Sequence, residues 1–490
     1  MVPEVILDGS RLTPAQLSSV AEGAIVRLDP DARRRMGDNY RWYVEQQPTD
    51  AVADKWSWIG PGELPPQPSL AFIRGHCTGV GDPLPQPWVR AVMAARANVL
   101  AGGHSGVRPE AVDVLLNMLE AGIIPVVPSQ GSVGAAGSAA LAHIAEVACG
   151  AGGHAWVDGH RQPGPDAMAG LRCLQPTSKE ALSLLNGSTL GTALSALAMD
   201  QARWLLSSAE AACALSMEAF RADSRCVAAS AMEVRRHPGA VQVAERLRAY
   251  LDGSGRVSPG RQPDPFSLRC APTVLGAVTD ALDHVESVIE RELNAAVDNP
   301  LVFPGEGVIE AGNFHGAPVS MATDHLRVAM TQVASISERR TYRLTYGSLS
   351  GLPSFLVQDS GVNSGLMLAQ YTAASLVSEC KGLAHPAAVD SIPTVQHNED
   401  HVSMGPISAR AALELLDVVS DVLGIELMCA AQAIDLRPPA PLGSGSQKVY
   451  DAVRRQVTQW GDDRVLHPDL DAMGASVRRG VFSKILESGS

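Results

Sequence analysis

Long segments with apolar residues at helical spacing constrain the fold of this chain more than any other feature. In the segment 408–434 these residues lie on nearly every side of the helix, and similar spacing recurs in 187–220, 274–293, 318–346 and 363–383. A helix that is apolar on most faces must be buried among other helices. The sequence therefore predicts an all-α protein built on a central bundle of long, antiparallel helices.

The first third of the chain differs from the rest in its density of turn residues. Glycine- and proline-rich stretches occur at 60–69, 79–87 and 123–138. Strand patterns are few and short, and 154–160 is the best candidate. The predicted regions are three: a loop-rich region that bears the site (1–180), a central long-helix bundle (181–440) and a C-terminal helical tail (441–490).

Composition excludes several classes of function. Hydrophobic residues make up 46% of the chain and charged residues 19%, which is enough apolar material for a large core. A formal net charge of -13 gives no basic surface for nucleic acid or anionic lipid. The N-terminus has no basic region followed by an apolar run, and no uninterrupted apolar stretch reaches membrane-spanning length. We expect a soluble, cytoplasmic protein that binds neither nucleic acid nor membrane.

The eight cysteines are scattered, without a Cys-x-x-Cys pair or a Cys/His group at zinc-ligand spacing. We interpret them as reduced thiols that mostly pack as small apolar side chains, and we predict no metal site. Cys77 and Cys270 are the least certain to be packing residues, because they lie in loop-like, motif-rich segments.

Ten sequence blocks occur in an order that is typical of one family. They are "RANVLAGGHSGVRPE" (96–110), "PVVPSQGSVGA" (125–135), "SLLNGST" (183–189), "SLRCAPTVLGA" (267–277), "DNPLVF" (298–303), "GNFHG" (312–316), "SERR" (337–340), "LSGLPSFLV" (349–357), "LAHPAAVDSIPT" (383–394) and "NEDHVSMG" (398–405). In these blocks the chain resembles the aromatic amino acid lyases, specifically their histidine ammonia-lyase branch. The resemblance covers nearly the whole chain. It implies a fumarase/ammonia-lyase-like all-α homotetramer, with active sites where several subunits meet.

The resemblance also implies a prosthetic group that this chain lacks the residues to make. In the family, an Ala-Ser-Gly tripeptide cyclises and loses water to give methylideneimidazolone (MIO), an electrophile. The matching positions here are Ala135, Ala136 and Gly137. The serine β-hydroxyl must leave to create the methylidene carbon, and Ala136 has no β-oxygen. We therefore predict that MIO is absent and that the protein has no cofactor.

Two other segments also depart from the family pattern. The stretch "GSAALAH" (137–143) is one residue shorter than the family's Gly-Asp-Leu-Ala-Pro-Leu-Ala-His and has Ser138 in place of the aspartate. The stretch 50–76 should carry a loop with the family's probable catalytic tyrosine, but it contains no tyrosine. By this comparison the electrophile and the base are both missing.

Several polar residues nevertheless match the family pocket. Arg269 falls on the arginine that clamps the substrate carboxylate, a role that suits a planar guanidinium; the alternative is a structural arginine in a buried ion pair. Phe266 replaces a second family tyrosine. Asn186 and Asn313 match residues that line the pocket and hold the cofactor, and they either orient substrate or only satisfy backbone groups.

Three further residues are candidates for acid–base chemistry. Glu399 occupies a position associated with recognition of the substrate amine or ring, and His397 replaces the family's usual asparagine. An imidazole close to a carboxylate can act as acid and base near neutrality. His76 in "GHCTGVGDPLP" (75–85) falls on a family histidine. We take Glu399, His397 and His76 as the catalytic candidates, with a solvated or packing role as the alternative.

Three hypotheses of function remain open from the sequence. The leading one is a repurposed biosynthetic enzyme that performs cofactor-free addition, elimination or cyclisation on a carboxylate-bearing, amino-acid-derived small molecule. The second is a pseudoenzyme that serves as a tetrameric binding or scaffold protein. The third is an ammonia-lyase inactivated by replacement of the MIO serine. Under all three, ordinary ammonia-lyase activity is not expected, and the substrate, the reaction direction and the natural or engineered origin of Ala136 stay open.

Overall fold

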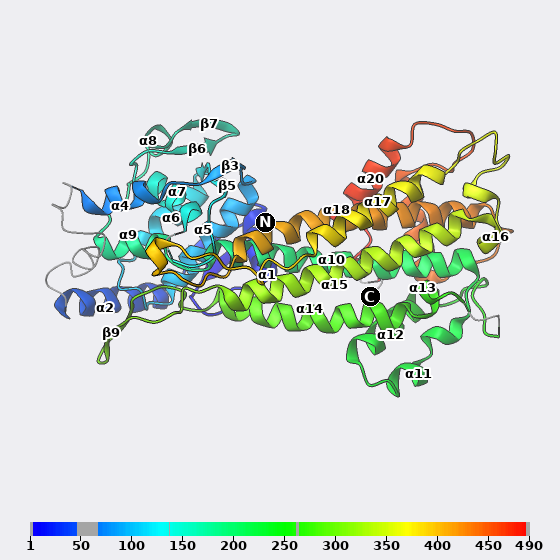
Figure 1. The fold of residues 1–490 in the computed structure, drawn as a ribbon, viewed down its shortest axis with the longest axis horizontal. Helices are drawn as coiled ribbons and strands as arrows, with labels where there is room; N and C mark the ends of the chain where they lie inside the picture. The colour runs from blue at the N-terminus through cyan, green and yellow to red at the C-terminus, as the bar shows by residue number, and fades with distance from the viewer. Residues whose placement is uncertain (1–2, 47–66, 137, 261–263, 487–490) are drawn as a thin grey trace. The chain divides into compact units, whose positions relative to one another are not determined.

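The structure, a computed structural model, describes residues 3–46, 67–136, 138–260 and 264–486 (Figure 1). Most of these residues are helical, which confirms the all-α prediction. The five predicted helical segments correspond to α10 (Thr189–Phe220), α14 (Ala271–Leu293), α15 (Ala317–Thr345), α17 (Met367–Leu383) and α18 (Gly405–Asp435). Each contains most of a segment that the apolar spacing predicts.

Burial explains why the longest of these segments are helical. In the second half of α18, Ile425, Leu427, Met428 and Cys429 are 2% exposed or less, although these positions point to different sides of the helix. This half is therefore packed on all sides, whereas the first half keeps Glu414 and Asp417 exposed on one face.

The chain divides into two compact units. Unit 1 comprises Met1–Asp200, Glu286–Thr323 and Pro386–Arg410, and unit 2 comprises Gln201–Val285, Asp324–His385 and Ala411–Ser490. The chain passes from one unit to the other inside α10, α14, α15 and α18. The division of the sequence into 1–180, 181–440 and 441–490 was drawn on composition and stays a prediction.

Unit 1 is more helical in the first third of the chain than we predicted. Its helices there are α1 (Pro14–Ala21), α2 (Pro30–Gln46), α4 (Pro68–His76), α5 (Gln86–Ala101), α6 (Glu110–Glu120), α7 (Ala139–Ala148), α8 (Gly164–Ala167) and α9 (Ser178–Leu185). In α5 nearly every residue from Val89 onward is buried. A short helix buried on all sides has no polar face, so its spacing does not reveal it.

Short paired strands connect the loops of unit 1 by backbone hydrogen bonds. The predicted strand at 154–160 is confirmed as a hairpin of β6 (His154–Val157) and β7 (His160–Pro163). The other strands are β1 (Glu4–Leu7) with β2 (Ile25–Leu28), β3 (Val80–Pro83) with β5 (Pro128–Gln130), β4 (Ile124–Pro125) beside β6, and β8 (Leu301–Phe303) with β9 (Gly307–Ile309).

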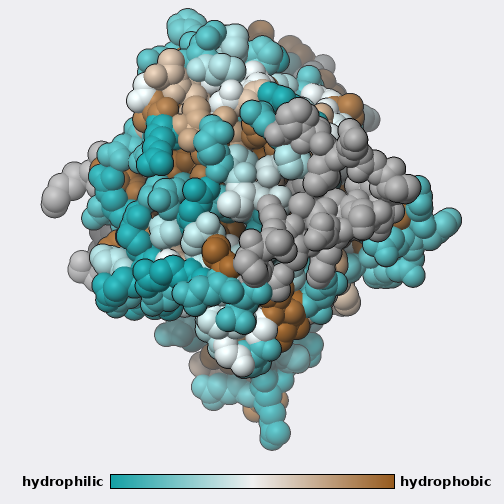
Figure 2. Space-filling model, turned by 90° about the vertical axis from the view of Figure 1, so that its left-hand side faces the viewer, coloured by the Kyte–Doolittle hydropathy of each residue, from teal (hydrophilic) through white to brown (hydrophobic). Residues whose placement is uncertain are grey.

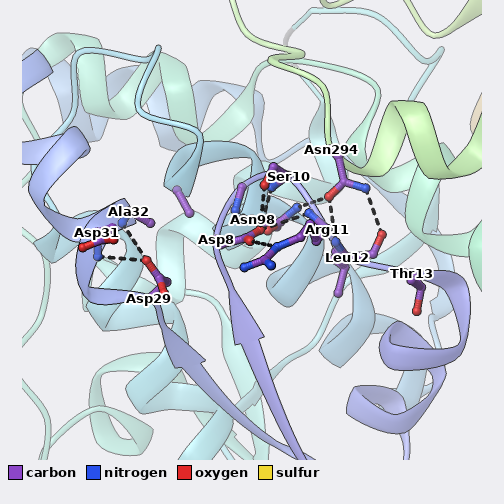
Figure 3. Close-up of polar contacts among 12 residues, drawn as sticks. Asp8, Ser10, Arg11, Leu12, Thr13, Asp29, Asp31, Ala32, Asn98 and Asn294 are labelled. Atoms are coloured by element: carbon purple, nitrogen blue, oxygen red, sulfur yellow. Dashed lines mark hydrogen bonds and ion pairs between the residues drawn. The ribbon is translucent and has the colours of Figure 1, made fainter.

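Buried amides fix the segment that follows β1 (Figure 3). Asn98 on α5 accepts a hydrogen bond from the backbone N–H of Gly9 at 2.9 Å. Asn294, just past α14, accepts from the N–H of Leu12 at 2.8 Å and donates to its carbonyl at 2.9 Å. Asp8 accepts from two backbone N–H groups of the following turn. These bonds satisfy backbone groups that no helix or strand pairs.

Unit 2 carries shorter helices beside the long ones. They are α11 (Ala229–Glu233), α12 (Pro238–Leu251), α13 (Phe266–Arg269), α16 (Gly347–Ser350), α19 (Ser444–Gln456) and α20 (His467–Arg478). Four residues of α13 form a single turn directly before α14, and this turn holds two of the predicted substrate-binding residues.

One stretch of the described chain, Ser178–Phe220, is long and apolar enough to cross a membrane by length and composition alone. Of its apolar window, 89% is buried inside the fold, as in the core helix of a globular protein. Hydrophilic residues predominate among the coloured atoms of the face drawn in Figure 2, with smaller hydrophobic areas between them.

Candidate functional site

Segments that are far apart in the sequence meet at the loop before α7. The carbonyl of Gly134 accepts hydrogen bonds from the N–H of Gly316 at 3.1 Å and from Oγ of Ser403 at 2.7 Å. The N–H of Met404 donates to the carbonyl of Val133 at 2.8 Å. The blocks "GSVGA", "GNFHG" and "NEDHVSMG" are therefore joined through their backbones.

Close packing restricts the backbone at Gly134 and Ala135. Gly134 has a φ of +82°, and a Cβ there would lie 2.3 Å from Oγ of Ser403, so only glycine fits. Ala135 is 3% exposed and belongs to a small apolar cluster with Val402, against which Phe314 packs. The loop is consequently held on both sides just before the predicted cofactor position.

The residues at that position do not fit the formation of MIO. Ala136 is half-buried and carries no β-oxygen, and Gly137 lies outside the described residues. The nearest following hydroxyl belongs to Ser138, which caps the N-terminus of α7 by accepting from the N–H of Leu141. Its Oγ also lies 3.0 Å from Oγ of Ser132. Ser138 therefore has a structural role, and Ala136 offers no leaving group.

Asn186 is held in place by the block "DNPLVF". Its side chain is 2% exposed, and Nδ2 donates to Oδ1 of Asp298 at 3.3 Å and to the carbonyl of Asn299 at 2.8 Å. Its Oδ1 is buried and has no hydrogen-bond partner among the described residues. A buried acceptor without a donor is rare in native proteins and is a place where a ligand can bind. Asn186 thus satisfies a backbone group and still offers an acceptor.

A buried ionic group supports this asparagine. Asp298 is fully buried, with Nζ of Lys179 at 3.2 Å from Oδ2 and Nη2 of Arg96 at 4.0 Å from Oδ1. Burial alone would raise the pKa of the Asp298 carboxyl, but Lys179 and Arg96 hold the pKa below its usual value. Burial lowers the pKa of Lys179, and Asp298 opposes that shift. The carboxylate is therefore ionised and anchors the Asn186 side chain.

Two histidines lie beside the joined segments. Nε2 of His315 is 3.2 Å from the carbonyl of His401 and 3.3 Å from its Nδ1, and the two rings stack at 5.3 Å. Asn313 is exposed and donates from Nδ2 to the carbonyl of Ala296 at 3.3 Å. The predicted substrate-binding role of Asn313 stays a prediction.

The loop that carries His397 and Glu399 is strained. Val395, Gln396 and His397 have φ values of +50°, +54° and +70°, in the left-handed region that favours glycine. Such residues cost about 1–3 kcal/mol each and cluster at functional sites. Glu399 is half-buried and accepts from Oγ1 of Thr394 at 2.8 Å, whereas His397 is exposed. No hydrogen bond joins the His397 and Glu399 side chains within the described part of the chain.

His76 is engaged locally. It is the last residue of α4, its Nδ1 is 2.8 Å from the carbonyl of Phe72, and the two rings lie 4.2 Å apart. The structure gives no contact between His76 and the other catalytic candidates, so its role also stays a prediction.

Arg269 and Phe266 belong to unit 2, where they form a stacked pair on α13. The guanidinium lies 5.0 Å from the ring centroid, a cation–π distance. Both side chains are exposed, Phe266 by 70%. Arg269 makes no ion pair with any residue in the described ranges, and its substrate-binding role stays a prediction. A free guanidinium on a rigid turn is suited to receive a carboxylate.

The turn itself is positioned by a buried ion pair. Nη1 of Arg340 donates to the carbonyl of Ser267 at 3.3 Å. The same guanidinium pairs with Glu426, with Nη2 at 2.7 Å from Oε2, and neither side chain has exposed surface. Arg340 therefore connects a fixed point of the α15–α18 packing to the turn that presents Arg269.

Sequence reasoning missed one group of chemically capable residues. Cys77 follows α4, and His143 and Glu146 lie one turn apart on α7. Their side-chain donor atoms all lie within 4.8 Å of one another. Spacing could not reveal the group, because Cys77 is distant in sequence from the other two.

Comparison with known proteins identifies the family. Residues 62–455 match the model of the aromatic amino acid lyases, and this chain belongs to that family. It is 41% identical to a curated histidine ammonia-lyase of Symbiobacterium thermophilum, and the match covers 99% of each chain. A histidine ammonia-lyase of Alkaliphilus oremlandii is 39% identical over 99% of this chain and 98% of its own.

A solved structure agrees with these relatives. The histidine ammonia-lyase of Trypanosoma cruzi superposes with a TM-score of 0.90 at 36% identity, covering 99% of this chain and 95% of its own. This likeness confirms the ammonia-lyase-like fold.

The comparisons overturn the functional predictions made from the sequence. Histidine ammonia-lyases 39–44% identical to this chain indicate an ordinary ammonia-lyase. The predicted cofactor-free repurposed enzyme is therefore wrong, and with it the expectation that ammonia-lyase activity is absent. The local departures at Ala136, in 137–143 and in 50–76 are therefore weaker evidence of function than the similarity of the whole chain.

Proposed function

We propose that this protein is an ammonia-lyase that releases ammonia from an α-amino acid, with histidine as the first substrate to test. The identity of 41% to a histidine ammonia-lyase over 99% of both chains carries the proposal. The joined loops around Gly134, the orphan acceptor of Asn186 and the free guanidinium of Arg269 support it, because each offers a group that an amino-acid substrate can use.

Each unit by itself offers groups that an amino-acid substrate can use. Arg269 would bind the carboxylate through two parallel hydrogen bonds. Glu399 and His397 would hold or move protons, and Asn186 would accept a hydrogen bond through Oδ1. His76 is the third candidate for proton transfer, and Asn313 and Phe266 are further candidates for substrate binding.

We also propose that the tripeptide Ala135–Gly137 forms no MIO, because Ala136 has no hydroxyl to lose. Intact mass spectrometry of the purified protein tests this point directly. We expect the mass of the encoded chain without dehydration. A dehydrated mass, whether it maps to this tripeptide or to Ser138, would refute the proposal.

Urocanate release from histidine, followed by ultraviolet absorbance on the same sample, tests the activity separately. Urocanate formation above the rate of heat-inactivated protein supports the lyase. If histidine, phenylalanine and tyrosine all remain intact, the lyase proposal fails, whatever the mass shows. Urocanate formation together with a dehydrated mass would leave the lyase standing and remove only the proposal about the cofactor.

Exposed apolar side chains support a homotetramer. On α15 Val328 and Tyr342 are 44% and 37% exposed, and on α17 Leu368 and Tyr371 are 55% and 67% exposed. Large exposed apolar residues mark interfaces, and closed symmetry is usual for such assemblies. Sedimentation that shows only monomer at micromolar concentration would contradict this.

We further propose that the protein works in the cytoplasm. Fractionation of the source cells tests the location. A biosynthetic role stays a prediction that neighbouring genes can test: genes of histidine degradation there would argue against it.

A further inference from the structure

A group of side chains with mixed metal-ligand types lies between the end of α4 and the middle of α7, both within unit 1. Its three members are Cys77, His143 and Glu146, which supply a sulfur, a ring nitrogen and a carboxylate oxygen. All three residues are half-buried, so the group is sheltered and still open to small solutes. His143 and Glu146 lie on the same face of α7 because they are three residues apart.

The histidine of this group has a ring nitrogen without a hydrogen-bond partner in the part of the chain that the structure describes. Nε2 of His143 is shielded from solvent and has no hydrogen-bond partner among the described residues. Leaving a buried nitrogen unpaired costs about 1–3 kcal/mol, so such an atom indicates a ligand or ion. Nδ1 of a histidine would remain free to bind water or a backbone group, as it does in most metal sites.

Two glycines lie directly beside the donor atoms. Gly152 has a positive φ, and a Cβ there would lie 2.5 Å from Oε1 of Glu146. A Cβ at Gly79 would lie 3.3 Å from Nε2 of His143. Glycine at these two positions lets the backbone lie close to the donor atoms of Glu146 and His143, where a larger residue would displace them.

From this geometry we infer that Cys77, His143 and Glu146 form a binding site for a divalent transition-metal ion, with zinc as the best match. Zinc accepts sulfur, imidazole and carboxylate ligands at about 2.0–2.3 Å, which places the donors roughly 3.5 Å apart in a tetrahedral site. Donors that already lie within 4.8 Å need only small side-chain movements to reach this spacing. Three protein ligands leave the fourth position to water.

The chemistry of the ligands also favours zinc over magnesium or calcium. Thiolate and imidazole are soft or borderline ligands, whereas magnesium and calcium require oxygen. Burial and the neighbouring Glu146 carboxylate raise the pKa of the Cys77 thiol to about 12, so metal binding must release a proton. The bound ion would tie α4 to α7, whose N-terminal cap immediately follows Ala136 and Gly137.

Metal titration of the full-length protein tests the site. The purified protein is stripped with a chelator and titrated with zinc against a chromophoric competitor, then with cobalt as a spectroscopic reporter. We expect about one zinc ion per chain, and a thiolate-to-cobalt charge-transfer band in the near ultraviolet. Removal of a group that merely orients a ligand costs about 10–100-fold in affinity, so Cys77→Ser should weaken zinc binding by about a hundredfold or more.

A matched control separates the site from general thiol effects. Cys173 is also a half-buried free cysteine of unit 1 outside the group, so Cys173→Ser should retain both the affinity and the cobalt band. Glu146→Gln serves as a second variant if Cys77→Ser does not fold. The proposal fails if the stripped protein binds no zinc, if the cobalt spectrum lacks the thiolate band, or if the site variants and the control bind equally.

Discussion

Replacement of Asp298 by asparagine tests the buried ionic group that supports Asn186. The substitution keeps the shape of the side chain but removes the only carboxylate within 4.0 Å of Lys179 and Arg96 among the described ion pairs. Both cations are 2% exposed or less, so water cannot replace the lost partner. Breaking a buried pair by removing one member typically costs about 3–5 kcal/mol.

Deprotonation of Lys179 sets an upper limit on the stability that Asp298→Asn can lose, and this limit is close to the same value. A lysine with an unperturbed pKa of about 10.4 can become neutral in the folded state at pH 7 for roughly 4–5 kcal/mol, at about 1.36 kcal/mol per pKa unit. The two estimates agree, and we expect Asp298→Asn to lower the free energy of unfolding by about 3–5 kcal/mol at pH 7.

The pH dependence of this loss has a defined sign. In the variant, the folded state holds Lys179 neutral, whereas the unfolded state protonates it, so unfolding takes up a proton and stability rises with pH. In the parent protein the pKa of Asp298 is below its usual value, so its charge does not change between pH 7 and 9. The deficit should therefore shrink over this range by up to about 1.36 kcal/mol per pH unit.

Denaturant unfolding at pH 7, 8 and 9 measures both effects. Asp113→Asn is the matched control, because Asp113 pairs with Arg33 at the surface with 32% and 47% of the side chains exposed. An exposed pair contributes about 0–1 kcal/mol. If Asp298→Asn costs no more than the control, or if its deficit widens with pH, then the buried carboxylate does not hold these two cations.

Three further substitutions test the turn of α13 and the strained loop. Arg269→Met should weaken binding of a carboxylate ligand about 10- to 100-fold in titration and leave the melting temperature nearly unchanged, because the side chain is exposed; a large fall in melting temperature at constant affinity would contradict the clamp. Arg340→Met should instead destabilise the fold by about 3–5 kcal/mol in denaturant unfolding, because it strands the buried Glu426 carboxylate. A loss below 1 kcal/mol would refute that. Glu399→Gln should reduce turnover while ligand affinity is retained, and unchanged turnover would remove Glu399 from the chemistry.

Helices with strong apolar spacing could be predicted from the sequence, and some others could not. The segment 408–434 coincides with most of α18 because its apolar residues recur at helical spacing and are too many for a strand. The helix α5 was missed because it lies between stretches rich in turn residues and is buried on nearly all sides, so its spacing shows no distinct polar face. Helix propensity and residue spacing are properties of a segment alone, whereas contacts with the rest of the fold decide the secondary structure of short segments.

The sequence could predict which residues belong to the candidate site, but it could not predict the contacts that those residues make. Asn186 and Arg269 could be named by resemblance, but the orphan Oδ1 of the first and the exposed stacking of the second depend on contacts with distant segments. The Cys77 group was missed for the same reason, since two helices bring its members together. The functional prediction was wrong because it rested on three local departures, at Ala136, in 137–143 and in 50–76, whereas the similarity extends over the whole chain.

Restoring the missing hydroxyl at position 136 tests whether MIO formation is prevented by the missing leaving group alone or also by the shortened loop. Ala136→Ser supplies the leaving group, but "GSAALAH" stays one residue shorter than the family pattern. The loop is held on one side by the bonds to the Gly134 carbonyl and on the other by the N–H of Ser138, which donates to the carbonyl of Leu185 at 2.9 Å. Cyclisation must contract the backbone between these two anchors, and each anchor resists movement.

We therefore expect Ala136→Ser to fold normally, since the position is half-buried, and to show no dehydration in intact mass spectrometry. A dehydrated Ala136→Ser protein would show that the shortened loop is no obstacle and that the single methyl group of Ala136 is the whole difference. Ser138→Ala is the control for adventitious dehydration at the helix cap: it should remove the N-cap bond, cost about 0.5–2 kcal/mol of stability and leave the mass result at position 136 unchanged.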